Sequence, residues 1–314
     1  GPADHTRYRA GDSIGGGTVI YNQLGTRLVD KAVSNGVMYY YDIWASDTSM
    51  NYSLISASGN VRPEATPILT ETDKVVASDS DEWDFFGRSV SISGDYAIAG
   101  APWHNRNGGQ SGSAYIFKPN GSDWVEEFQL FPATPKSDAW FGSAVAISGD
   151  YAVVGAYGED LMTHTGGVVY VFHREGSAWR QQARLTKSDS ANAAMFGQTV
   201  AIDGDCIIVG TGMNEAAYVF SRSGTNWTEQ AKLVASDLEW GCGFGSNVAI
   251  SGNYAFVGAP GDDGGGACSG SVYVFNRVGA NWTKQTKLFA PDPGRSGAFG
   301  TDVSISGDYA VVGG

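Results

Sequence analysis

The chain has 314 residues, of which 17% are charged and 44 are glycine, and its formal net charge is −13. An apolar fraction of 42% can build a core, and glycine is costly inside helices, so the composition excludes a disordered chain and argues against a helical bundle. The negative charge argues against a nucleic-acid backbone binder and against docking on anionic lipid, and no apolar run approaches the roughly 20 residues that span a bilayer.

Residues 3–62 are predicted to form a small module of their own, followed by a proline-containing linker at 63–67. Thr18–Tyr21 is predicted to be a strand, and Tyr39–Ala45 alternates in the manner of a second strand. The pattern is similar to the last strands of a fibronectin type III domain, in which Tyr39 would be the tyrosine-corner residue. About a third of such a domain is absent at the front, so we expect a partial, β-sandwich-like segment.

A repeat organises residues 68–314. Each copy opens with Phe-Gly and continues with an alternating strand, a Gly-Asp or Gly-Asn pair and a second strand. The steps between the opening phenylalanines are 55, 55, 48 and 55 residues. The copies are Phe86–Pro102, Phe141–Tyr157, Phe196–Gly212, Phe244–Pro260 and Phe299–Gly314.

Each repeat unit predicts four strands, here called a, b, c and d. The Gly-Asp or Gly-Asn pair between a and b predicts a two-residue hairpin turn, where φ > 0 is needed. Strand c is a Tyr-x-Phe segment, and strand d carries a Trp and, six residues later, a Leu. Units of this size and strand number are typical of the blades of a β-propeller, whereas a β-sandwich with similar turns is the alternative.

The Phe-Gly openings, together with Gly100-Ala101-Pro102 and Gly258-Ala259-Pro260, resemble the FG-GAP repeat of the integrin α-subunit propeller. The closer resemblance is to bacterial extracellular proteins with tandem repeats of this type. It implies an all-β fold, a β-propeller of four-stranded antiparallel blades. Thr72–Asp79 copies a strand-d segment, which gives the order d, four sets of abcd, and ab. Five blades would result, but the family more often has seven, so we expect a ring truncated at the C-terminus.

The sequence predicts neither a metal site nor a catalytic set. Integrin-type blades hold calcium in long Asp-rich a–b loops, but here each a–b connection is a short turn with too few oxygens for calcium. The four histidines are scattered. Gly266–Gly270 has the form of a nucleophile elbow, but it lies in a glycine-rich loop before a strand c, where that motif has no function. We therefore expect no cofactor.

The sequence places a binding surface on the b–c loops. The spacing from the strand-b Gly to the strand-c Phe is 17, 17, 10 and 17 residues, so the length variation falls in these loops. In a four-stranded antiparallel blade, the b–c loops and the d–a linkers emerge on the same face. The candidate binding residues on this face are Trp103, His104, Tyr157, Asp160, Trp240, Asp262 and Asp263.

Of the three cysteines, Cys242 and Cys268 are expected to form a disulfide. Cys242 lies in a d–a linker and Cys268 in the b–c loop of the blade that follows it, and both segments are rich in glycine. Cys206 replaces the strand-b Tyr of other copies and is expected to be a lone thiol.

These features favour a non-catalytic extracellular module, secreted or on the cell surface, that serves adhesion or ligand binding within a larger protein. Its partner would be a protein or a glycan at the cell surface, with no nucleic acid and no membrane insertion. One alternative is a lectin-like, carbohydrate-binding propeller. Another is an accessory domain of a secreted enzyme. The fold alone does not select among these ligands.

Overall fold

The computed structural model describes residues 13–14, 17–18, 44–46, 52–54 and 74–314, the last range with gaps at 106–108, 122, 161–165, 190–194, 213–215, 236, 238–240, 265–267 and 291–297. The chain divides into two units, Gly1–Lys74 and Val75–Gly314. The described part of the chain contains no helix that could cross a membrane.

In the first unit the described residues are four short strands, which pair as two hairpins. The pairs are β1 (Ser13–Ile14) with β2 (Gly17–Thr18), and β3 (Trp44–Ser46) with β4 (Tyr52–Leu54). β3 includes the end of the strand predicted at Tyr39–Ala45, whereas Tyr39 itself lies outside the described residues. The fibronectin-like character of this unit stays a prediction.

The second unit is all-β and follows the repeat. Sheets 1 to 4 each have four antiparallel strands in chain order, and the two strands of sheet 5 continue the series. Sheet 1 is β5 (Val90–Ser93), β6 (Tyr96–Ala101), β7 (Ser113–Asn120) and β8 (Asp123–Leu130). Sheet 2 is β9 (Ala144–Ser148), β10 (Tyr151–Ala156), β11 (Val168–Glu175) and β12 (Ala178–Leu185). Sheet 3 is β13 (Phe196–Asp203), β14 (Cys206–Thr211), β15 (Ala216–Ser223) and β16 (Asn226–Val234). Sheet 4 is β17 (Val248–Ser251), β18 (Tyr254–Ala259), β19 (Ser271–Val278) and β20 (Asn281–Leu288), and sheet 5 is β21 (Asp302–Ser306) with β22 (Tyr309–Gly313).

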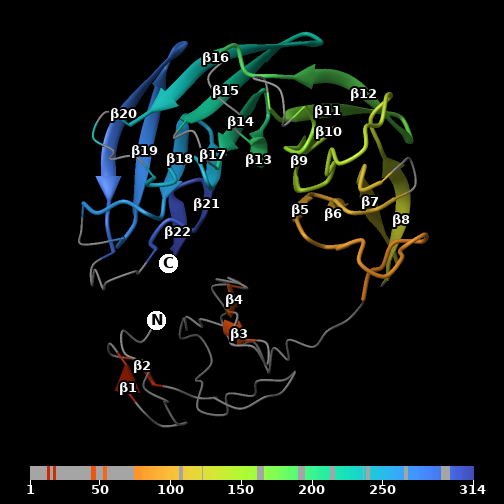
Figure 1. The fold of residues 1–314 in the computed structure, drawn as a ribbon, viewed down its shortest axis with the longest axis horizontal. Coiled ribbons are helices and arrows are strands. Elements are labelled where there is room, and N and C mark those ends of the chain that lie inside the picture. Colours follow the sequence, from red (N-terminus) through yellow and green to blue (C-terminus); the bar gives the residue numbers. More distant parts are fainter. Residues whose placement is uncertain are drawn as a thin grey trace. The chain divides into compact units, whose positions relative to one another are not determined.

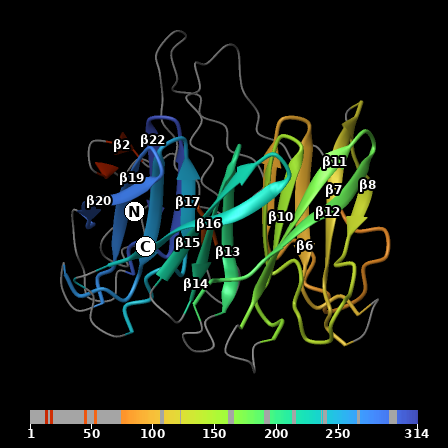
Figure 2. The same ribbon diagram turned by 90° about the horizontal axis from the view of Figure 1, so that it is seen from above.

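The turns and bulges repeat from sheet to sheet. Ser93 pairs with Tyr96 across the first a–b turn, and Gly94 between them has φ 56°, as the predicted two-residue hairpin requires. A β-bulge interrupts the c–d pairing immediately before the strand-c Phe in all four larger sheets. Bulges increase the local twist. In Figure 2 the inner strands accordingly stand nearly upright, while β12 and β16 slant across them.

The sheets of the second unit follow one another around an arc (Figure 1), with β5, β9, β13, β17 and β21 on its inner side and β8, β12, β16 and β20 on its outer side. Each inner strand contacts the inner strand of the next sheet. Apolar side chains of neighbouring sheets form the cores between them, as Ile98 of sheet 1 does with Val145 and Ile147 of sheet 2. This arrangement is that of consecutive propeller blades, and it confirms the predicted fold class.

The glycines of the repeat motif let neighbouring sheets approach closely. A Cβ atom on Gly100, in strand b of sheet 1, would lie 1.9 Å from the carbonyl oxygen of Gly142, the Phe-Gly glycine of sheet 2. The same contact joins Gly155 to Gly197 at 2.0 Å. Real Cβ atoms do not approach this closely, so the strand-b position needs glycine, and Gly142 is needed in its own right because its Cβ would lie 2.2 Å from the Ser113 carbonyl oxygen. One glycine lies on each side of the boundary between sheets.

Two expectations about the repeat need correction. Phe141, Phe196 and Phe244 are fully buried, but Phe86 and Phe299 are only half-buried, because sheet 1 and sheet 5 each pack against one neighbouring sheet. Residues 74–79, the described part of the segment expected to be a strand d, form no strand. They pack on sheet 1 instead, where Val75 and Ala77 join its core and the Ser78 hydroxyl donates a hydrogen bond to Glu126.

Candidate functional site

The b–c loops and the d–a linkers meet at one edge of each sheet. The end of the sheet 1 loop joins the linker into sheet 2, because the Phe141 N–H donates to the Ser111 carbonyl at 3.0 Å. The start of the sheet 2 loop joins the same linker through the Gly158 N–H and the Ala139 carbonyl, at 3.2 Å. The linker into sheet 2 therefore lies between the b–c loops of sheets 1 and 2.

A cavity of about 450 Å³ opens on this face at sheet 1. Asp79 and Asp81 of the segment that leads into sheet 1 line one side, and His104 and Asn105 of its b–c loop line the other. The Asn105 side-chain oxygen accepts a hydrogen bond from the Gln110 N–H at 2.6 Å, which closes the loop on itself. The cavity thus offers carboxylate, imidazole and amide groups to a ligand.

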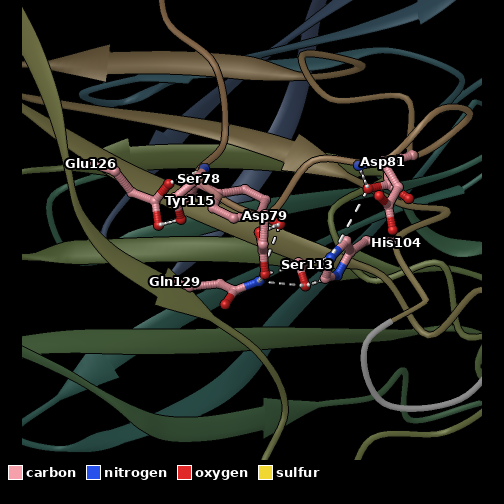
Figure 3. Close-up of polar contacts among 9 residues, drawn as sticks. Ser78, Asp79, Asp81, His104, Ser113, Tyr115, Glu126 and Gln129 are labelled. Carbon is pink, nitrogen blue, oxygen red and sulfur yellow. Dashed lines mark hydrogen bonds and ion pairs between the residues drawn. The ribbon is translucent and has the colours of Figure 1, made fainter.

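His104 forms the buried wall of the cavity, with only 5% of its surface exposed. Its Nδ1 lies 2.9 Å from the Ser113 hydroxyl, which fixes the orientation of the ring (Figure 3). Its Nε2 lies 3.6 Å from a carboxylate oxygen of Asp79 and 4.0 Å from one of Asp84. These distances are longer than hydrogen bonds, so Nε2 is within reach of two carboxylates without a tight contact to either.

Asp79, which lies before sheet 1 in the chain, is hydrogen-bonded to side chains of β7 and β8. The Tyr115 hydroxyl donates to Asp79 at 2.8 Å, and the Gln129 amide donates to the other carboxylate oxygen at 3.1 Å. Figure 3 shows Gln129 reaching Ser113 as well, so the group is connected to His104. Burial raises the pKa of Tyr115 above its usual range, and the Asp79 carboxylate raises it further. Tyr115 therefore remains a hydrogen-bond donor at neutral pH.

The same tyrosine–carboxylate contact recurs in every four-stranded sheet. Tyr170 donates to Glu159 at 2.6 Å, and Tyr218 to Asp189 at 2.9 Å. Tyr273 lies 3.4 Å from Asp262. The residue opposite each tyrosine on strand d also contacts the carboxylate; these residues are Gln129, Arg184, Lys232 and Lys287. The contact is thus part of the repeat, although Glu159 and Asp262 are buried and Asp79 and Asp189 are partly exposed.

Sheet 1 differs from sheets 2 and 4 at the loop position of His104. The backbone N–H of His104 donates to the Ala101 carbonyl. The backbone N–H groups of Glu159 and Asp262 donate in the same way to the carbonyls of Ala156 and Ala259. The backbone therefore makes the same turn at this position of the three loops, where an imidazole replaces a carboxylate. The repeat could have revealed this equivalence, because His104, Glu159 and Asp262 each lie four residues after the strand-b glycine.

Two exposed aromatic side chains pair near His104 in the chain. Trp103 precedes His104 and remains exposed, and its ring packs edge-on against that of Phe85 with 4.3 Å between centroids. Phe85 is exposed as well and has φ 55°, a conformation that bulky residues rarely adopt. Trp103 and Phe85 together form an exposed apolar pair.

The comparison with protein families agrees with this architecture. The FG-GAP repeat matches residues 69–117, 124–172, 179–223, 227–275 and 282–314. The chain belongs to the FG-GAP repeat family. No curated protein matches the chain. FG-GAP repeats typically occur in extracellular domains, and their propellers are generally non-catalytic.

The predicted binding residues of this FG-GAP protein lie in different environments. His104 lines the cavity of sheet 1, and Trp103, which precedes it in the chain, is exposed. Tyr157 packs against Trp140 on sheet 2, with 5.0 Å between ring centroids. Asp263 is exposed on sheet 4, where its carboxylate accepts a hydrogen bond from Cys268 N–H. Trp240 lies outside the described residues. The predicted set is therefore spread over the face and does not form one pocket.

Two of the predicted residues are held in ion pairs within the chain. Asp160 is 2.9 Å from Lys136 and 3.3 Å from Arg184. Asp262 is buried and lies 2.5 Å from Lys287. Burial raises the pKa of Asp262, but the Lys287 ammonium and the Ser271 hydroxyl outweigh it, so the pKa lies below its usual range. Asp262 therefore has a role in the fold of sheet 4.

The expected disulfide is not formed in the structure. Cys242 is buried in the linker into sheet 4, and its carbonyl accepts a hydrogen bond from the Gly261 N–H at the start of the sheet 4 b–c loop, at 2.9 Å. Cys268 is exposed at the end of that loop, where its carbonyl accepts from Ala298 N–H in the next linker. The start of the loop thus bonds to the linker that holds Cys242, whereas Cys268 bonds to the linker that follows sheet 4. Cys206 is buried on β14, and Arg277 donates to its sulfur at 2.6 Å.

Metal coordination also has no candidate among the described residues. No three His, Cys, Asp or Glu side chains in these ranges gather as a group that could hold an ion. The a–b connections are short turns in which one Asp or Asn follows the glycine and, in sheet 3, Asp203 also precedes it.

Proposed function

We propose that the chain is a non-catalytic ligand-binding module that works outside the cell in adhesion, with the cavity at sheet 1 as its binding site. The observation that carries the proposal is the cavity lined by Asp79, Asp81, His104 and Asn105 on the face of loops and linkers. Loops on a rigid β-scaffold are where recognition residues concentrate. Membership of the FG-GAP family supports the extracellular setting.

The preferred partner is a protein that presents a basic side chain. Carboxylates of Asp79 and Asp81 line the cavity, and the chain carries a net charge of −13. A surface of one sign speeds the approach of a partner of the opposite sign and favours its correct orientation. The exposed Trp103 next to the cavity offers the aromatic anchor that protein interfaces favour.

A carbohydrate ligand is the second candidate. The exposed Trp103–Phe85 pair offers an apolar surface for a sugar ring, and Asp81 and Asn105 lie nearby to bond hydroxyl groups. A glycan would bind with little dependence on salt, whereas a basic peptide would bind less well as salt screens the carboxylates. The salt dependence of binding therefore distinguishes the two.

The experiment uses surface plasmon resonance on the full chain against a panel of lysine- and arginine-containing peptides, with a glycan array in parallel. Asp81→Asn and Trp103→Ala should each weaken the response at least tenfold. Asp95→Asn, in the exposed a–b turn of sheet 1, is the matched control and should leave it unchanged. Equal binding by all variants would refute the site. Hydrolase activity that is lost on changing cavity residues would refute the non-catalytic assignment.

A further inference from the structure

Sheet 2 provides an internal reference for the cavity at sheet 1, because a constant offset of 55 residues relates the two repeat copies. The b–c loops make the same backbone contact where they close. The Gly112 N–H donates to the His104 carbonyl at 3.0 Å, and the Gly167 N–H donates to the Glu159 carbonyl at 2.7 Å. Residues at the same position of the two copies can therefore be compared directly.

In sheet 2, the place that corresponds to the cavity holds two cationic side chains. The Lys136 ammonium lies 2.9 Å from a carboxylate oxygen of Asp160 and 3.2 Å from one of Glu159. The Arg184 guanidinium lies 2.9 Å from Glu159 and 3.3 Å from Asp160. A base of the linker and a base of strand d thus bind the same two carboxylates at the start of the b–c loop.

Sheet 1 carries neither of these two cations. Asp81 occupies the position of the lysine in the linker, and Gln129 occupies that of the arginine on strand d. His104 and Asn105 replace the two carboxylates of the loop. The acidic side chains of this place therefore come from the linker in sheet 1, whereas sheet 2 has them on the loop.

These replacements account for the cavity. The Asp81 side chain is much shorter than a lysine, so it cannot reach across to the loop. The Gln129 amide turns to Asp79 at 3.1 Å and to Ser113 at 3.3 Å (Figure 3). The 450 Å³ between linker and loop correspond to the place that two long cationic side chains occupy in sheet 2.

The access of solvent to this place does not depend on what precedes sheet 1. In sheet 2, which packs against sheet 1, the side chains of Lys136 and Asp160 are still 46% and 32% exposed. The same place is therefore open toward the outside between two packed sheets, and a partner can reach it from the face of loops and linkers.

The strand-d position carries a cation in the other four-stranded sheets as well. Lys232 of sheet 3 forms an ion pair with Asp189, and Lys287 of sheet 4 lies 2.5 Å from Asp262. Gln129 is thus the uncharged member of a set that is otherwise basic. The repeat is built to hold a cation against the carboxylates at this edge of each sheet.

We propose that the cavity takes up a lysine or arginine side chain of the partner protein, whose cationic end occupies the place that the Lys136 ammonium and the Arg184 guanidinium occupy in sheet 2. This inference rests on the proposed function and gives its ligand a chemical identity and a position. The cation lies against the carboxylates of Asp79 and Asp81, where charge-assisted hydrogen bonds hold it. The partner thereby supplies a group that the other sheets take from the chain itself.

Giving sheet 1 a cation of its own tests the proposal. Gln129→Lys copies strand d of sheets 3 and 4, and it should weaken binding of a Gly-Lys-Gly peptide with blocked ends by roughly tenfold or more in microscale thermophoresis, because the two like charges compete for one place. Gln285→Lys makes the same change at an exposed position of β20 and should bind as the unchanged chain does. A thermal melt of each variant checks that it is folded.

A second comparison uses the unchanged chain, so it decides the proposal even where a variant does not fold. A blocked Gly-norleucine-Gly peptide keeps the aliphatic stem without the ammonium and should bind roughly tenfold more weakly than the lysine peptide. Equal binding of the two peptides would overturn the proposal.

The outcomes also separate this proposal from the proposed function. A folded Gln129→Lys chain that binds the lysine peptide undiminished would overturn the placement of the cation. If Asp81→Asn still abolishes binding in that case, the cavity remains the site. Binding of glycans alone that is lost in Asp81→Asn would likewise overturn this inference and leave the cavity as the site. A chain that binds neither peptides nor glycans would refute both.

Discussion

Replacing Gly155 by alanine tests the reason given for the paired glycines of the repeat. Gly155 lies in β10 without a left-handed φ, so alanine meets no backbone restriction there. Its Cβ would lie 2.0 Å from the Gly197 carbonyl oxygen, 3.1 Å from the Gly197 carbonyl carbon and 3.4 Å from the Ala144 Cβ. The obstacle is backbone of the next sheet, which no side-chain rotation can relieve.

The cost follows from this geometry. Sheets 2 and 3 must separate by roughly 1 Å at their inner strands to restore an ordinary contact, which loosens the core between them. Overpacking of this kind costs about 1–3 kcal/mol and occasionally more, and the rigid obstacle places Gly155→Ala at about 3 kcal/mol. In a unit of this size that lowers the melting temperature by roughly 6–12 °C.

Urea unfolding followed by tryptophan fluorescence measures the change, and two other glycines serve as controls. Gly109→Ala has 3.4 Å to its nearest neighbour and no left-handed φ, so it should change the unfolding free energy by less than about 0.5 kcal/mol. Gly149→Ala has open space but φ 54°, so it should cost about 1–2 kcal/mol. If Gly155→Ala is tolerated as well as Gly109→Ala, close approach is not the reason for the motif.

Three further predictions concern the core, the ion pairs and the ionisation of a tyrosine. Phe141→Ala should cost about 3–5 kcal/mol of unfolding free energy by urea titration, and Phe86→Ala clearly less, because Phe86 is only half-buried; equal costs would contradict the packing. Lys287→Met should lower the unfolding free energy by about 3 kcal/mol, since it leaves the buried Asp262 without its ion-pair partner. Arg180→Ala, in an exposed ion pair, should lower it by less than about 1 kcal/mol. Similar losses for the two variants would contradict the burial of the Asp262 pair. Burial raises the pKa of Tyr273 from 10.0 to about 12, so the unfolded chain ionises first and the stability should fall as pH rises through that interval. The part of the 295 nm absorbance that Tyr273→Phe removes should titrate late, and an ordinary tyrosine titration of that part would contradict the prediction.

The candidate site could be predicted only as a surface. Variable loop length pointed to the b–c loops, and of the predicted residues His104 lines the cavity; binding there stays a prediction. Asp79 was not among the expected binding residues, because its segment was assigned to a strand. It reaches the cavity through contacts with Tyr115 and Gln129, residues 36 and 50 positions away in the chain. No local pattern records such a pairing.

The sequence by itself determined the strands, the turns and their repetition. The alternation of apolar residues and the Gly-Asp pairs are local features that determine where strands and hairpin turns form, and the Phe-Gly spacing shows that they repeat. Only the tertiary structure decided the burial and the contacts of individual charged and sulfur-containing side chains. Asp262 and Asp263 are neighbours in one loop, yet the first is buried against Lys287 and the second is exposed. Likewise, Cys242 lies in the linker that bonds to the start of a b–c loop, whereas Cys268 lies at the end of that loop and bonds to the next linker, and these contacts form only when the sheets pack.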